Sequence, residues 1–316
     1  MLPAALLFAA LSAPTVAAPS PAPAAPPLTP VVTMAAPHAV LLRAPDDEAK
    51  PVFTLTPVPY AAGEAFDVET VLEIKLEATI GVGFLAQTIN YDLREQERLG
   101  VRVQAPEKGE QARREFSYTQ REATSIAPIV GKKTKQRRVH GKSYVIIAKG
   151  DDRIVNDASG TVVREKEAKY VRATFLALGG VQPALFSCLP DEGETALTVG
   201  QTIEVGSEAA KRLLGLPLDQ LEIESLTLTV TGAGPDGTLD LNAEATLGGE
   251  AEIGERALSL EGSLAGPIII DPATARVSRM ELTGSASIVS ESEESMLSGS
   301  GQGDIVLRKM VRARKD

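Results

Sequence analysis

The sequence predicts an α+β protein built on one long, curved, half-barrel-like antiparallel sheet, with two or more helices packed on one face. Residues 66–80 alternate apolar and mainly polar side chains at a period of two, which is typical of a strand with one face on a core. Further apolar segments are short and separated by glycine, proline and aspartate turns. Such segments favour sequential antiparallel pairing over a parallel sheet.

The N-terminal residues have the layout of a secretory signal peptide. An apolar run from Met1 to Ala13 leads into small residues, with Ala17 and Ala18 as a cleavage site. The run is shorter than the about 20 residues of a membrane-spanning helix, and no cysteine follows it as a lipid acceptor. We therefore expect residues 1–18 to direct export of a soluble protein to the periplasm or extracellular space, without a transmembrane segment. The alternative is a disordered tail on a cytosolic protein.

Composition divides the rest of the chain. Most of the 21 prolines precede residue 60, so residues 19–62 are expected to form a disordered Pro/Ala-rich linker. Residues 63–316 are numerous enough for a single β-rich domain, or for two packed halves at 63–180 and 189–312.

The first half is expected to contain a series of strands and one helix. The strands expected after 66–80 are 89–93, 101–104, 114–122, 143–149, 153–155 and 161–163. Between residues 165 and 178, the positions Tyr170/Val171, Thr174/Phe175 and Leu178 recur at a spacing of three to four, and Gly179-Gly180 provides a stop.

The second half is expected to be a helix followed by a meander. Residues 207–214 have Ser207 as N-cap and Gly215 after their end, which predicts a helix. The expected strands are 221–231, 238–247, 257–264, 267–270, 276–289 and 303–311, with turns that include 248–249 and 271–275.

Part of this half resembles a group of uncharacterised exported bacterial β-rich proteins. The stretches that carry the resemblance are Leu189-Pro190, residues 197–203 (LTVGQTI) and residues 266–275 (GPIIIDPATA). They are similar to the patterns LP…V-x-V-G-D-x-W and G-x-x-x-x-D-x-x-T-G of that group, with Gln201, Ile203 and Ala275 as departures. The wider architecture is similar to the periplasmic lipoprotein-carrier type of fold, which implies a curved sheet wrapped around an apolar groove.

Residue types suited to catalysis are scarce. Of the two histidines, His38 falls in the expected linker, which leaves His140 as the one candidate base, and no G-x-S-x-G elbow occurs. One cysteine, Cys188, and one histidine cannot make a zinc site. We therefore expect no catalytic residues, no metal and no cofactor, and a protein that is not an enzyme.

The clearest functional signal is a basic segment in a chain of formal net charge −10. Its candidate anion-contact residues are Lys132, Lys133, Lys135, Arg137, Arg138, His140 and Lys142. They fit a phosphorylated headgroup, an acidic polymer or the acidic half of another copy. The alternative is a solvated loop whose lysines discourage edge-to-edge strand pairing. No aromatic residues are interleaved to stack bases, so we expect no nucleic-acid partner.

These observations lead to two hypotheses. The first is an exported, non-catalytic binding or carrier protein that holds an apolar or lipid-like ligand against its helices in a groove of the curved sheet. The second is a structural or interaction protein of the bacterial cell envelope with a filled core. The expected partners are an apolar ligand or an anionic envelope component. Solvent-exposed apolar residues lining a continuous groove would distinguish the first hypothesis from the second, and a packed interior would contradict the carrier hypothesis.

Overall fold

The computed structural model describes residues 50–82, 85–127, 131–189, 195–216, 222–234, 237–253, 256–290 and 297–314. The expected signal peptide, most of the expected linker and Pro190 of the resemblance lie outside the described residues.

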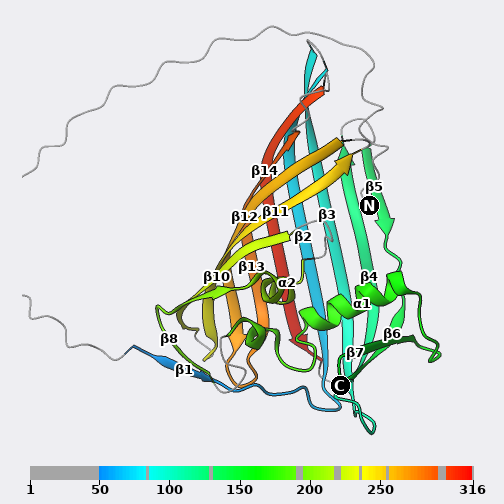
Figure 1. Cartoon of the computed structure of the whole chain (residues 1–316), viewed down its shortest axis with the longest axis vertical. Coiled ribbons are helices and arrows are strands. Elements are labelled where there is room, and N and C mark those ends of the chain that lie inside the picture. Colours follow the sequence, from blue (N-terminus) through cyan, green and yellow to red (C-terminus); the bar gives the residue numbers. More distant parts are fainter. Residues whose placement is uncertain are drawn as a thin grey trace, which may run out of the picture.

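One antiparallel sheet of 12 strands forms the body of the molecule (Figure 1). From edge to edge it runs β7 (Asp152–Asp157), β6 (Ser143–Lys149), β4 (Ala112–Ala127), β3 (Leu85–Gln104), β2 (Ala65–Val82), β14 (Leu297–Ala313), β13 (Arg276–Ser290), β12 (Arg256–Asp271), β11 (Leu239–Ile253), β10 (Glu222–Ala233) and β9 (Thr202–Val205). β5 (Gly131–Gln136) pairs with β4 off this path. In Figure 1 the sheet curves so that β10–β12 lie in front of β14 and β2. The predicted class, α+β with a long curved antiparallel sheet, is confirmed.

In the described residues, three short helices lie on the concave face, in the lower part of Figure 1. They are α1 (Glu165–Ala177), the 3₁₀ helix η3 (Ala184–Cys188) and α2 (Ser207–Leu214). α1 contacts β6 and β7, whereas α2 contacts β10 and η3. Gly215 ends α2 in a left-handed conformation (φ 60°), as the sequence predicts. The predicted N-cap is wrong, because Gly206 caps α2 and the Ser207 hydroxyl donates instead to the carbonyl of Ile223, at 2.7 Å.

Ordered structure begins before residue 63, within the expected linker. β1 (Val52–Leu55) pairs with β8 (Thr195–Thr198) in a separate two-stranded sheet. Tyr60 then lies between two guanidinium groups, with Arg114 at 4.0 Å and Arg276 at 3.7 Å from its ring centroid. The segment before β2 is therefore attached to both halves of the chain.

Several strands are longer than the sequence indicated. The expected strands 89–93 and 101–104 both belong to β3, and 257–264 and 267–270 both belong to β12. Gly248 and Gly249, an expected turn, lie inside β11. The side chain of Glu224 on the neighbouring strand lies over Gly248 and would have to move if residue 248 carried a side chain. The expected strand 161–163 contributes only one bridge, between Val162 and Asn156.

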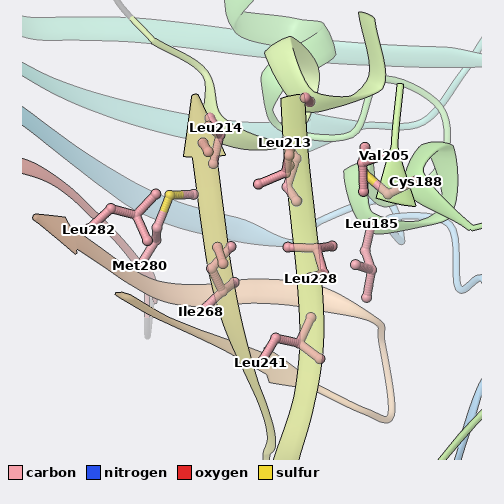
Figure 2. Close-up of a cluster of buried hydrophobic side chains, with 14 of the residues drawn as sticks. Leu185, Cys188, Val205, Leu213, Leu214, Leu228, Leu241, Ile268, Met280 and Leu282 are labelled. Carbon is pink, nitrogen blue, oxygen red and sulfur yellow. The ribbon is translucent and has the colours of Figure 1, made fainter. Parts of the chain in front are cut away.

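The space between the helices and the sheet is filled by two apolar clusters. The first joins α2 and η3 to the strands from β9 to β14, and includes Leu213, Leu228, Leu241, Ile268 and Met280 (Figure 2). The second joins α1 to β2, β3, β4, β6 and β7. The two clusters meet at the central strands β2 and β3, which contribute residues to both.

Gly284→Ala tests the close approach of strands that the curvature imposes. A Cβ at Gly284 of β13 would overlap the carbonyl oxygen of Ser263 on β12. We expect the substitution to lower the free energy of unfolding by about 1–3 kcal/mol, because overpacking forces the backbone to shift. Urea denaturation measures this. The control is Gly232→Ala on β10, where an added Cβ meets no atom within 4 Å. Equal losses in the two variants would contradict the prediction.

Candidate functional site on the concave face

A cluster of charged side chains is buried on the concave face of β3 and β4. Glu95 and Glu97 alternate with exposed or half-buried residues of β3 and so lie on the same face as Leu93 and Leu99. The Glu95 side chain is fully buried, and its carboxylate lies 2.9 Å from the guanidinium of Arg121, itself 2% exposed. Buried charges are tolerated when they are paired in this way.

Two further residues complete this central charge cluster, which comprises Glu95, Glu97, Arg121, Arg137 and Tyr170. Arg137, in the turn after β5, contacts the other oxygen of Glu95. Tyr170 of α1 donates its hydroxyl to Glu97, which also lies 3.5 Å from Arg121. Burial raises the pKa of Glu97, while Arg121 and the Tyr170 hydroxyl act in the opposite direction. The cluster therefore links α1 to the sheet through polar contacts.

A β-bulge in β4 places Arg121 on the concave face. The pairing with β3 shifts at Leu99, which faces Tyr118, and leaves Thr119 as the extra residue. Without the extra residue, the alternation along β4 would turn Arg121 outward. The backbone N–H of Arg121 donates to Nδ1 of His140 at 3.1 Å, where β5 has ended and β6 has not begun. His140 therefore accepts the backbone hydrogen bond of Arg121, which lies between the stretches of β4 that pair with β5 and with β6.

Lys309 of β14 is fully buried beneath the C-terminal ends of both α-helices. Its Nζ donates to the carbonyl of Ala177, the last residue of α1, at 3.0 Å. A side chain at Gly215, which ends α2, would lie 3.5 Å from the same nitrogen. Helix C-terminal ends carry partial negative charge, which favours a cation. Burial lowers the pKa of Lys309 to about 8, although Glu97 acts in the opposite direction.

The basic segment is not one solvated loop, because residues 131–136 form the edge strand β5. Its backbone pairs are Lys132 with Ile126, Lys133 with Ser125, Thr134 with Thr124, and Lys135 with Ala123. Residues paired directly across antiparallel strands project to the same face. Ala123 and Ser125 share the face of Arg121, so Lys133 and Lys135 project to the concave side and Lys132 to the outer side. All three lysines are exposed.

The other members of the segment have separate environments. Arg137 belongs to the central charge cluster, His140 caps the backbone of Arg121, and Lys142 lies 3.0 Å from Glu167 of α1. Arg138 is exposed. Within the described residues, Lys132, Lys133, Lys135 and Arg138 make no ion pair.

Above the central charge cluster, no helix of the described part covers the ends of β2, β3, β13 and β14 (Figure 1). Concave positions here are Leu76 and Ala78 on β2 and Ile288 on β13, all half-buried. Gly301 of β14 lies between them, because it pairs with both Ala78 and Ile288. We call Leu76, Ala78 and Ile288 the upper apolar surface.

A cavity of 490 Å³ opens at the other end of the sheet, between the two apolar clusters. Tyr60, Glu64, Leu178, Arg276 and Lys309 contribute to its wall. Tyr60 donates to the carbonyl of Leu178 at 2.9 Å, and Arg276 lies 2.8 Å from Glu64. The polar wall groups are thus largely engaged with one another.

In the described residues, no group of three or more His, Cys, Asp or Glu side chains is arranged to hold a metal ion. Cys188 is buried in η3, and burial raises the pKa of its thiol to about 12. None of the helices in the described ranges combines the length and apolar character needed to cross a membrane.

No family model matches the sequence, and no curated protein matches it. Among solved structures, the chain is similar to lipovitellin, in a structure titled for its lipid–protein interactions, with a TM-score of 0.39, 7% identity, and coverage of 81% of this chain and 26% of that chain. It is also similar to an outer membrane channel from Pseudomonas putida F1, with a TM-score of 0.24, 8% identity, and coverage of 86% and 100%. The chain thus spans about a quarter of the lipovitellin chain. Neither similarity defines a family or a function.

Sequence reasoning missed the buried charges. No functional role was predicted for Glu95, Glu97, Arg121, Tyr170 or Lys309. The sequence around the two glutamates does contain a sign that they are buried. From Val103 back to Ile89 along β3, every second residue is apolar or aromatic except these two glutamates. Two acidic residues at core-facing positions of a strand predict buried cationic partners.

Lys309→Met tests the buried ammonium through the pH dependence of stability. The pKa of Lys309 is about 8 in the folded protein and 10.5 ordinarily. Between these values the unfolded chain holds a proton that the folded protein has released, so the free energy of unfolding rises with pH. We expect a rise of about 1 kcal/mol from about pH 7.5 to about pH 9, measured by urea denaturation. Lys309→Met should lack this rise, and an identical pH dependence in both proteins would contradict the prediction.

Proposed function

We propose that the protein is a non-catalytic binding protein that holds an apolar or lipid-like ligand against the upper apolar surface of its curved sheet. The observation that supports this is the division of the concave face into two levels. Below the central charge cluster, the space under the helices is filled by the two apolar clusters. Above it, Leu76, Ala78 and Ile288 lie on the concave face without a covering helix in the described part of the chain.

The shape of this level suits an extended ligand. Gly301 and Gly303 of β14 pair with Ala78 and Leu76, and a side chain at either glycine would meet the backbone of β2. At these two positions β14 therefore contributes no side chain to the surface between the apolar residues. Apolar side chains that stay partly exposed on a concave sheet are candidates for a ligand or partner site. The apolar clusters under the helices favour the upper level as the ligand site, although a 490 Å³ cavity opens between them at the lower end of the sheet.

A second candidate is an interaction protein of the cell envelope with a filled core. The filled lower level favours it, as does the exposed basic edge strand β5. The two candidates differ in one measurable property, because only the binding protein retains an apolar molecule. Native mass spectrometry of protein purified from its own host envelope would detect such a molecule.

Ile288→Asp tests the proposed surface. The substitution would place a carboxylate beneath the ligand, and burying it unpaired costs more than the about 1.4 kcal/mol that a tenfold change in affinity requires. We expect binding of a fluorescent fatty-acyl probe to weaken at least tenfold, measured by fluorescence titration.

The matched control is Val289→Asp, at the adjacent residue, which is 48% exposed and faces the outer side. This variant should bind the probe as the unmodified protein does, and circular dichroism should show both variants folded. Equal weakening in both variants, or no probe binding by the unmodified protein, would refute the proposed function.

Export is part of the proposal and rests on the N-terminal sequence. Sequencing the N-terminus of the protein isolated from its host should give a start near Ala18 or Pro19. Recovery of intact Met1 from the cytoplasm would argue against export.

A further inference from the structure

We infer that the ligand carries one anionic headgroup on a long acyl chain, and that Lys133 and Lys135 bind this headgroup. The inference rests on the proposed function, since it assigns the polar end of the same ligand. Three observations carry it: the sidedness of β5, the local balance of charge, and the distance to the upper apolar surface.

The sidedness of β5 follows from its register with β4. Lys133 pairs with Ser125 and Lys135 with Ala123, without a register shift between them. The hydroxyls of Thr134 and Thr124 lie 3.0 Å apart, which shows that these intervening residues share the other face. Two exposed ammonium groups therefore project from the concave side of the edge strand.

The concave face at this corner has more cations than carboxylates. Glu95, the nearest buried carboxylate, already contacts both Arg121 and Arg137. Lys133 and Lys135 make no ion pair with any described residue, so both ammonium groups are available to a ligand. The side chains beside them on β4, Ala123 and Ser125, are small and leave room for a headgroup.

The lysines lie one row of residues from the upper apolar surface. Lys133, Ser125, Leu93 and Ile74 follow one another across β5, β4, β3 and β2. Leu76 begins the next row toward the upper end of β2. Three strand spacings separate β5 from β2, or about 14 Å. An extended acyl chain can span this distance, with its headgroup at the lysines and its tail over Leu76, Ala78 and Ile288.

The experiment compares anionic and neutral amphiphiles by isothermal titration with the full-length protein. The probes are palmitate, a monoacyl phosphate and hexadecanol, so that the two anionic arms separate a carboxylate from a phosphate headgroup. We expect the better anionic probe to bind about tenfold more tightly than hexadecanol, as hydrogen bonds to charged groups allow. Added salt should weaken only the anionic probes.

The matched variants are Lys133→Gln and Lys132→Gln, which remove one charge from adjacent residues on opposite faces. Lys133→Gln, and more strongly the double variant with Lys135→Gln, should reduce the preference for the anionic probes. Lys132→Gln should leave it unchanged, and hexadecanol should bind all variants alike.

Two results would overturn the inference. One is equal binding of anionic and neutral probes, which leaves the proposed function standing. The other is equal loss in Lys132→Gln and Lys133→Gln, which indicates general attraction between the whole strand and anionic surfaces. Failure of all three probes to bind would instead refute the proposed function, and the inference with it.

Discussion

Lys309 lies near the centre of the sheet, on the strand that joins the two ends of the chain. β14 pairs with β2 along its whole length, so residues beyond 297 hold residues 66–82 in place. A buried ammonium group needs acceptors, and the Ala177 carbonyl at the end of α1 supplies one. The end of α2 comes close enough that Gly215 has little room for a side chain. The buried charge thus ties the end of α1 to the central strands, and α2 packs beside α1 at this point.

The central charge cluster lies among apolar side chains of the concave face, because Leu93 and Ile74, one row further up, still belong to the first apolar cluster. Glu95 and Arg121 are almost completely buried. Arg137, whose side chain is 34% exposed, contacts Glu95 at the surface. Below this level, apolar side chains from the helices and the sheet fill the interior. Above it, the described strands continue without helices. The charged row thus lies within the packed face, and the half-buried Leu76, Ala78 and Ile288 lie further up, without a covering helix in the described residues.

The sequence predicts the fold where hydrophobic alternation is uninterrupted. β2 was predictable because its core-facing residues from Phe66 to Ile80 are nearly all apolar. β3 was divided in two because Glu95 and Glu97 occupy core-facing positions, where a period-two pattern counts them as breaks. β11 was shortened because Gly248 and Gly249 indicate a turn, whereas Gly248 in the sheet admits the side chain of a neighbouring strand. The alternation of β3 hints at buried acids, but their cationic partners and the close approach of strands are long-range properties that a local pattern does not identify.

The basic segment shows the same limit, because a run of charges does not reveal which face each member occupies. Edge protection requires only that charged side chains flank an unpaired strand, and Lys132 on the outer face meets this requirement as well as any other. Lys133 and Lys135 face the concave side, where their charge would attract an anionic ligand bound over Ala123 and Ser125. The two interpretations of the segment, edge protection and anion contact, therefore apply to different residues of one strand. The register of β5 with β4 distinguishes them, and that register depends on backbone hydrogen bonds that composition does not encode.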